Sequence, residues 1–114
     1  MDEQSSLLPN ANLAFIDPAK VRDYLLCDTH PVGRFKSAFF HALGFTQGRW
    51  EDLRDEFLRI AHTQNATAAR ASTSGSKYVV DGILNGPRGK NVEVRTIWIV
   101  SNDARPRFVT AYPR

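Results

Sequence analysis

The sequence of 114 residues contains a single cysteine, Cys27, so it can form no internal disulfide. Such cysteine usage is typical of proteins that fold in a reducing compartment, and we expect a cytoplasmic location. No apolar run approaches the roughly 18 residues of a membrane-spanning helix, and the acidic start, Met1 to Glu3, is unlike a signal peptide. We therefore expect no membrane partner. The sequence has no His-x-x-x-His pair and no paired cysteines, so we predict no metal site and no cofactor.

Charge is spread unevenly along the chain, although the formal net charge is only +3. Residues 1–57 contain six Lys and Arg against nine Asp and Glu, which gives −3. Residues 58–114 contain nine Lys and Arg against three Asp and Glu, which gives +6. The basic C-terminal half is either a binding surface for phosphate groups or a sheet whose cations prevent edge-to-edge aggregation.

The C-terminal part of the chain predicts an antiparallel sheet. Two apolar, β-branched runs at 77–84 and 92–100 are separated by the turn formers of 85–91, and a third run follows at 107–112. Short strands joined by tight turns are typical of a meander. Because 92–100 carries bulky side chains on both of its faces, we expect it to be a central strand.

Three helices are predicted before this sheet. Asp17 followed by Pro18 is a strong helix start and predicts a helix at 18–26. The next predicted helix, 33–43, ends at Gly44 and places Phe35, Phe39 and Leu43 on one apolar stripe. The third, 49–63, carries an apolar stripe made of Trp50, Leu53, Phe57 and Ile60.

The remaining segments complete the expected architecture. Residues 7–16 are apolar but broken by a proline, and we expect them to lie extended across the core with a short edge strand at 14–16. The small, polar segment 65–76 is interpreted as a mobile loop, with an extension of the third helix through 66–71 as the alternative. We expect one α+β domain, 1–114, in which a helical half (1–65) packs on a small antiparallel sheet of three to four strands (77–114).

The segment 30–36 is the clearest candidate for chemistry. His30 is followed closely by Arg34 and Lys36, and Gly33 permits close approach of the backbone at a helix start. A histidine beside two cations could act as acid or base on a phosphodiester while the cations stabilise negative charge. The alternative is a polar loop at a solvated helix start. For His41, a structural role is the better interpretation.

Side chains of the predicted sheet are the candidates for substrate binding. Aromatic residues on the strands could stack on nucleic-acid bases, although such residues more often form the core. The candidates are Lys77, Trp98 and Tyr112.

Segments spread over nearly the whole chain resemble a bacterial family of domains of unknown function of about this length. The matching segments are 8–11, 16–20, 24–26, 30–34 with Lys36, 39–40, 78–82, 86–87, 94–100 and 109–113. The layout of helices followed by a small antiparallel sheet is also similar to the barnase-, EndoU-, colicin- and RelE-like ribonucleases of toxin–antitoxin and contact-dependent systems. This second resemblance implies that the catalytic roles fall to His30, Arg34, Lys36, Arg95 and Thr110.

Two functional hypotheses follow. The first is a small bacterial ribonuclease-type toxin that cleaves RNA without a metal, in which His30 acts as base or acid and Arg34, Lys36 and Arg95 surround the phosphate. Its partners would be RNA and a cognate antitoxin or immunity protein. The second is a non-catalytic binding module, namely an antitoxin, an immunity-like partner or an adaptor that uses the basic sheet face. A toxin should bring His30, Arg34 and Arg95 to one cleft, whereas a binding module need not.

Overall fold

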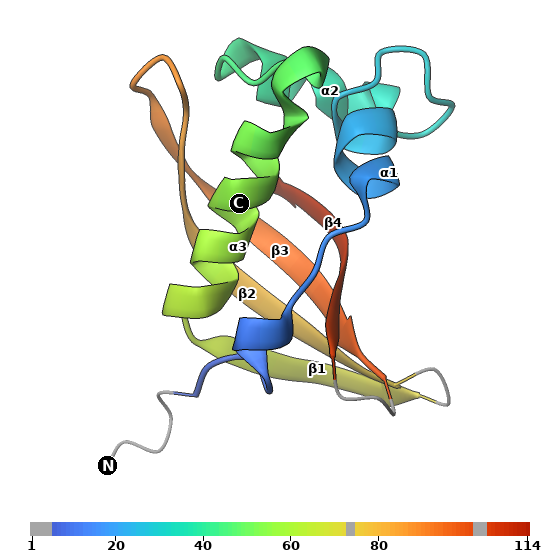
Figure 1. Cartoon of the computed structure of the whole chain (residues 1–114), viewed down its shortest axis with the longest axis vertical. Coiled ribbons are helices and arrows are strands. Elements are labelled where there is room, and N and C mark those ends of the chain that lie inside the picture. The colour runs from blue at the N-terminus through green and yellow to red at the C-terminus, as the bar shows by residue number, and fades with distance from the viewer. Residues whose placement is uncertain (1–5, 73–74, 102–104) are drawn as a thin grey trace.

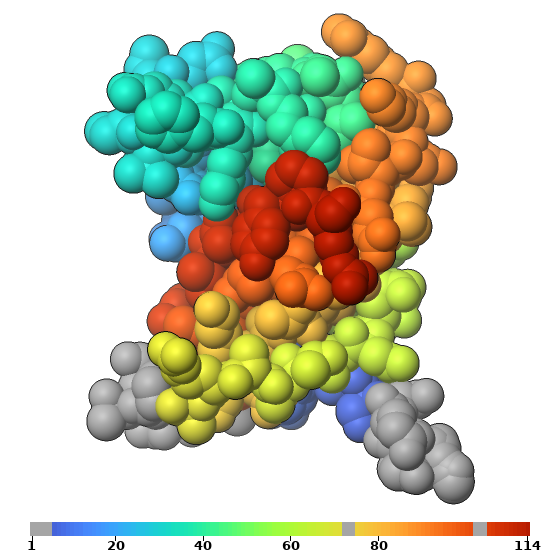
Figure 2. All heavy atoms as spheres, turned by 180° about the vertical axis from the view of Figure 1, so that it is seen from behind, coloured from blue at the N-terminus to red at the C-terminus, as the bar shows by residue number. Residues whose placement is uncertain are grey.

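One face of a four-stranded antiparallel sheet carries the helices, and the other face is free of them (Figures 1 and 2). The computed structural model describes residues 6–72, 75–101 and 105–114. The strands follow one another across the sheet in chain order. They are β1 (Ala66–Ser72), β2 (Gly75–Asn85), β3 (Asn91–Val100) and β4 (Pro106–Pro113). The predicted α+β meander is therefore confirmed, and β3 is a central strand as expected.

Helices precede the sheet along the chain. The first is a short α-helix, α1 (Pro18–Lys20), which continues as a π-helical turn, η2 (Val21–Leu25). As predicted, Asp17 caps it, with the carboxylate accepting the backbone N–H of Ala19 at 2.9 Å. The second and third helices are α2 (Arg34–Ala42) and α3 (Trp50–Thr63), and two 3₁₀ turns, η1 (Ala11–Leu13) and η3 (Gln47–Arg49), complete the set.

The predicted end of α2 and the predicted edge strand at 14–16 both agree with the structure. Gly44 follows α2 with a φ of 104°, the left-handed conformation that a glycine adopts without strain after a helix. The edge strand expected at 14–16 is present as an isolated parallel bridge between Phe15 and Arg107 of β4. The N-terminal segment thereby lies along the free edge of β4.

The prediction of a mobile loop at 65–76 is wrong for the residues that the structure describes there. Residues 66–72 form β1, which pairs with β2 and has a register shift between Ala68 and Arg70. The loop was inferred from small, polar side chains without apolar alternation. β1 is an edge strand, and its side chains from Thr67 to Ala71 are exposed. Backbone pairing with β2 stabilises it, and the sequence pattern carries no signal for that pairing.

The stripe predicted for α2 is partly wrong. Leu43 is buried and Phe39 is half-buried, but 76% of the Phe35 surface is exposed. The helix buries Ser37 and Phe40 instead. Phe35 lies in the first turn, where its ring stacks beneath the Arg34 guanidinium at 4.8 Å instead of entering the core.

Aromatic rings join the helices to the sheet in the core. Phe57 of α3 stacks on Phe108 of β4 with ring centroids 4.9 Å apart, and Phe40 of α2 meets Phe57 edge-on. Phe108 also meets the ring of Trp98 on β3. The predicted stripe of α3 is confirmed, with Leu53, Phe57 and Ile60 fully buried and Trp50 half-buried.

Replacement of Phe57 should test this core. Phe57→Ala removes a fully buried ring between α2 and β4 and should lower the free energy of unfolding by about 3–5 kcal/mol in chemical denaturation. Phe35→Ala is the matched control, because the exposed ring should cost no more than about 0.5 kcal/mol. A similar loss for both variants would contradict the assignment of the core.

Candidate functional site

A cavity of about 500 Å³ opens between the first helical segment, the 30–33 turn and β4. Its walls are formed by Ala19, Lys20, Tyr24, His30, Val32, Val109 and Thr110. We call it the Lys36 pocket, because the ammonium group of Lys36 lies within hydrogen-bonding distance of two of its lining side chains. In Figure 2 the start of α2 (teal) adjoins β4 (red) at this edge of the sheet.

Lys36 connects α2 to the sheet and to the first helical segment. Its Nζ donates to Thr110 Oγ1 at 2.8 Å and to Tyr24 Oη at 3.2 Å. The same ammonium group lies 5.4 Å from the centroid of the Tyr24 ring and 5.8 Å from that of Tyr112. A cation held by two hydroxyls and two aromatic rings is fixed in place and has no carboxylate partner among the described residues. Its charge is therefore available to an anion.

Tyr24 and Lys20 are the polar residues lining this pocket that the sequence does not single out. Partial burial would by itself raise the pKa of the Tyr24 phenol, but its hydrogen bonds with Thr110 and Lys36 and the Lys36 charge outweigh this. The pKa of Tyr24 therefore lies below its ordinary value of about 10. The phenol is positioned against a cation that stabilises its ionised form.

His30 also lines the pocket, with its ring edge-on to Tyr24 at a centroid distance of 5.0 Å. Its Nδ1 accepts the backbone N–H groups of Val32 and Gly33 at 3.0 and 2.9 Å. Because a backbone N–H can only donate, Nδ1 carries no proton in this arrangement, and the ring proton is on Nε2. His30 can thus offer an N–H donor from Nε2.

Gly33 sets how closely this turn approaches the helical segment. A Cβ atom at position 33 would collide with the carbonyl oxygen of Tyr24. The glycine therefore allows the 30–33 turn to pack directly on the Tyr24 backbone. This close approach brings the His30 and Tyr24 rings together.

Other residues predicted for the site lie elsewhere, so His30, Arg34 and Arg95 do not form the single cleft expected of a toxin. The guanidinium of Arg34 stacks on the exposed ring of Phe35. The guanidinium of Arg95 forms a two-pronged pair with the Asp81 carboxylate at 2.9 and 3.0 Å. The Asp81 partnership is the main reason that the pKa of Arg95 lies above its ordinary range. Arg95 pairs with Tyr112 across the β3–β4 ladder and does not line the Lys36 pocket.

The three residues predicted to bind substrate lie in different environments. Trp98 is fully buried, and its indole N–H donates to Thr96 Oγ1 at 2.8 Å. We therefore leave Trp98 out of the site, because it has no exposed surface for a substrate to contact. Lys77 is exposed on the helix-free face of the sheet, whereas Tyr112 lies next to Lys36.

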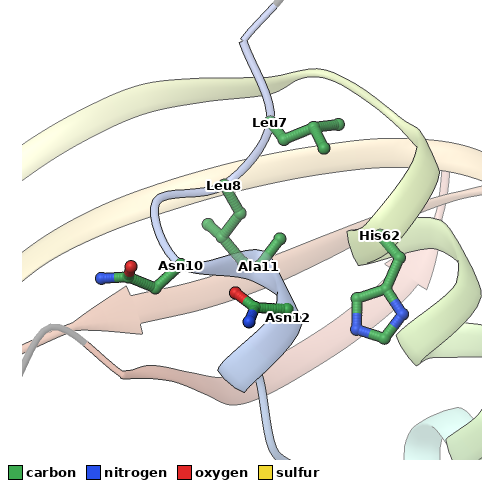
Figure 3. Close-up of a pocket in the computed structure, with 6 residues that line it drawn as sticks. All are labelled: Leu7, Leu8, Asn10, Ala11, Asn12 and His62. Atoms are coloured by element: carbon green, nitrogen blue, oxygen red, sulfur yellow. The ribbon is translucent and has the colours of Figure 1, made fainter.

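The other two histidines lie outside the pocket. Both ring nitrogens of His41 face backbone carbonyl oxygens, that of Phe45 at 2.9 Å and that of Leu26 at 3.0 Å, which fits the expected structural role. His62 lies beside the N-terminal segment in a second cavity of about 470 Å³ (Figure 3). The remaining residues that line this cavity are apolar or amide side chains, namely Leu7, Leu8, Asn10, Ala11 and Asn12.

The described residues offer neither a metal site nor a membrane-spanning helix. No group of three or more His, Cys, Asp or Glu side chains in ranges 6–72, 75–101 and 105–114 could hold a metal ion. In the same part of the chain, no helix is long and apolar enough to cross a membrane.

The Asp81 ion pair makes a prediction about pH. Its hydrogen bond with Arg95, aided by the charges of Arg95 and Arg114, holds the pKa of Asp81 below its ordinary value of about 3.9. Asp81 thus stabilises the fold above about pH 4, and this contribution is lost as the pH falls through the lowered pKa. Asp81→Asn should reduce the denaturation midpoint at pH 7, and the difference from the wild type should shrink at pH 2–3.

Asp55→Asn serves as the control for this measurement. Asp55 also contacts an arginine, but its side chain is 64% exposed on α3, so the substitution should lower the midpoint at pH 7 by much less. An Asp81→Asn variant whose midpoint differed from the wild type by the same amount at every pH would contradict the predicted linkage.

Comparisons with known proteins place the chain in a family. A search of curated proteins finds no match. Among solved structures, a chain of a contact-dependent growth inhibition toxin–immunity protein complex from Klebsiella pneumoniae 342 has the same fold, with a TM-score of 0.72 and 19% sequence identity. The match covers 87% of this chain and 98% of that chain. Residues 7–114 match the family described as a domain of unknown function, DUF6883, and the protein therefore belongs to that family.

Proposed function

We propose that this protein is a small bacterial toxin domain that cleaves RNA at the Lys36 pocket without a metal ion. The observation that carries the proposal is the Lys36 ammonium group, held between Tyr24 and Thr110, which line the pocket together with His30. A cation, a phenol of lowered pKa and an imidazole N–H donor are together suited to a phosphodiester. Similarity of fold to a chain of a toxin–immunity protein complex supports a role in such a pair, as the toxin or as the immunity protein.

The reaction would use the ribose hydroxyl next to the cleaved bond. The 2′-oxygen attacks phosphorus, its proton passes to solvent water, and the bond from phosphorus to the 5′-oxygen breaks. The products are a 2′,3′-cyclic phosphate and a free 5′-hydroxyl. Lys36 would neutralise the charge that develops on the phosphate oxygens.

We assign the proton transfer to Tyr24 instead of His30. With Nδ1 occupied by two backbone N–H groups, His30 has no lone pair on Nε2 to act as a base. His30 would donate the Nε2–H to a phosphate oxygen. Tyr24 would give its phenolic proton to the departing 5′-oxygen, and Lys36 would stabilise the phenolate that remains. Thr110 and Tyr112 would hold Lys36 and the substrate in position.

Tyr24→Phe should separate binding from cleavage. Loss of the phenolic proton should slow RNA cleavage by about 10²–10⁴-fold, while affinity for RNA should change little. In the wild type, the rate should fall as the pH rises through the lowered pKa of Tyr24, because the phenolate cannot donate. This alkaline decline should be absent in Tyr24→Phe.

Tyr78→Phe is the matched control, because Tyr78 is half-buried on β2 and does not line the pocket. It should cleave RNA at the wild-type rate and keep the alkaline decline. If Tyr24→Phe retained both the rate and the pH profile, Tyr24 would have no part in proton transfer.

Growth of cells provides the test of the toxin role itself. Induction of the wild-type protein should inhibit growth, and Lys36→Gln, which removes the charge held by Tyr24 and Thr110, should relieve the inhibition. Total RNA from the induced cells should show fragments that carry 5′-hydroxyl ends. If the wild type is neither toxic nor able to cleave RNA, the alternative of a non-catalytic binding module, such as an immunity-like partner, is favoured.

A further inference from the structure

A row of cations crosses the helix-free face of the sheet at the end away from the β2–β3 turn. Arg70 of β1 pairs in register with Lys77 of β2, Lys77 pairs with Ile99 of β3, and Ile99 pairs with Arg107 of β4. Residues paired across adjacent strands lie on the same face. We call Arg70, Lys77 and Arg107 the cationic row. All three are exposed, and the row spans about 14 Å, or three strand spacings.

The cationic row is not neutralised by the carboxylates of the same face that the structure describes. Those carboxylates belong to Asp81 and Glu93, and both contact Arg114, while Asp81 also binds Arg95. Asp81 lies four residues from Lys77 along β2, about 13 Å away, which exceeds the screening length of about 8 Å at physiological salt. Among the described residues, no ion pair involves Arg70, Lys77 or Arg107, and the Arg107 guanidinium donates a hydrogen bond to the Ser101 hydroxyl.

The row is continuous with the Lys36 pocket through β4. Arg107 and Thr110 are three residues apart, so the row begins about 10 Å from the hydroxyl that holds Lys36. Beside this stretch of β4, Ile97 pairs with Thr110 and Val79 pairs with Ile97, so the neighbouring side chains of the face are apolar. An extended chain of regularly spaced anions could therefore run from the pocket onto the row.

We propose that the cationic row binds the phosphate backbone of a single-stranded RNA segment whose cleaved phosphate lies in the Lys36 pocket. This inference rests on the proposed function. It means that the preferred substrate extends several nucleotides beyond the cleaved bond on one side. A protein partner fits this part of the face less well. The centre of a protein interface is apolar and depleted in lysine, whereas the exposed hydrophobic side chains of this face, Ile83 and Tyr112, lie away from the row.

The test compares two substrates of different length. For a fluorescent single-stranded RNA of 12 nucleotides, Arg70→Ala/Arg107→Ala should weaken binding about tenfold at physiological salt. It should also reduce the slope of log affinity against log salt by about 1.4, since each lost phosphate contact removes about 0.7. Cleavage of a dinucleotide, too short to reach the row from the pocket, should be affected much less than cleavage of the longer RNA.

Two variants serve as controls. Arg70→Lys/Arg107→Lys keeps both charges and should retain most of the salt slope. Lys90→Ala removes an exposed charge from the β2–β3 turn, at the far end of the sheet, and should leave affinity unchanged. Denaturation midpoints confirm that each variant is folded.

The outcomes separate the two proposals. If the wild type cleaves RNA but Arg70→Ala/Arg107→Ala keeps the full salt slope, the cationic row is wrong and the proposed function stands. If the wild type neither binds nor cleaves RNA, both fail. A third outcome is that polyglutamate binds as tightly as the 12-nucleotide RNA and loses its binding equally in the double variant. In that case the row binds acidic polymers of any kind, and the RNA assignment is overturned.

Discussion

The stacking of Phe57 on Phe108 is the contact on which the arrangement of the molecule depends. It joins the long helix α3 to β4 through two fully buried rings, and Phe40 brings α2 against the same pair. Since a close-packed core does not deform gradually, these rings fix how α2 lies over the edge of β4. The 2.8 Å contact of Lys36 with Thr110, far apart in sequence, is a consequence of that placement.

The fold could be predicted where side-chain pattern and tertiary environment agree. β3 was predicted within one residue at its start, because its apolar residues are buried in a central strand. β1 was not, because an edge strand of alanine, threonine and serine is stabilised by backbone pairing that leaves no trace in hydrophobicity. Phe35 was misplaced for the opposite reason: the helical period includes it in an apolar stripe, but its ring stacks with Arg34 at the helix start.

The candidate site was predictable in part. Lys36, His30 and Thr110 are all predicted for the site, whereas no local pattern sets Tyr24 apart from the other apolar and aromatic residues of 18–26. Its role depends on contacts with residues twelve and more positions away, which only the folded chain brings near. Arg95 is predicted to lie near His30 and Lys36 because the sequence does not show how the strands pair. In the sheet Arg95 pairs with Asp81, whose carboxylate binds its guanidinium.

The bridge between Phe15 and Arg107 bears on the order in which the native contacts form. The helices and the meander close short loops, because their partners are near in sequence. At the edge of β4, by contrast, the Arg105 guanidinium donates to the Leu13 carbonyl oxygen across 92 residues. The entropy lost in closing a loop grows with its length. Docking of this segment therefore costs less entropy once the sheet has already formed. We therefore expect the N-terminal segment to dock late in folding.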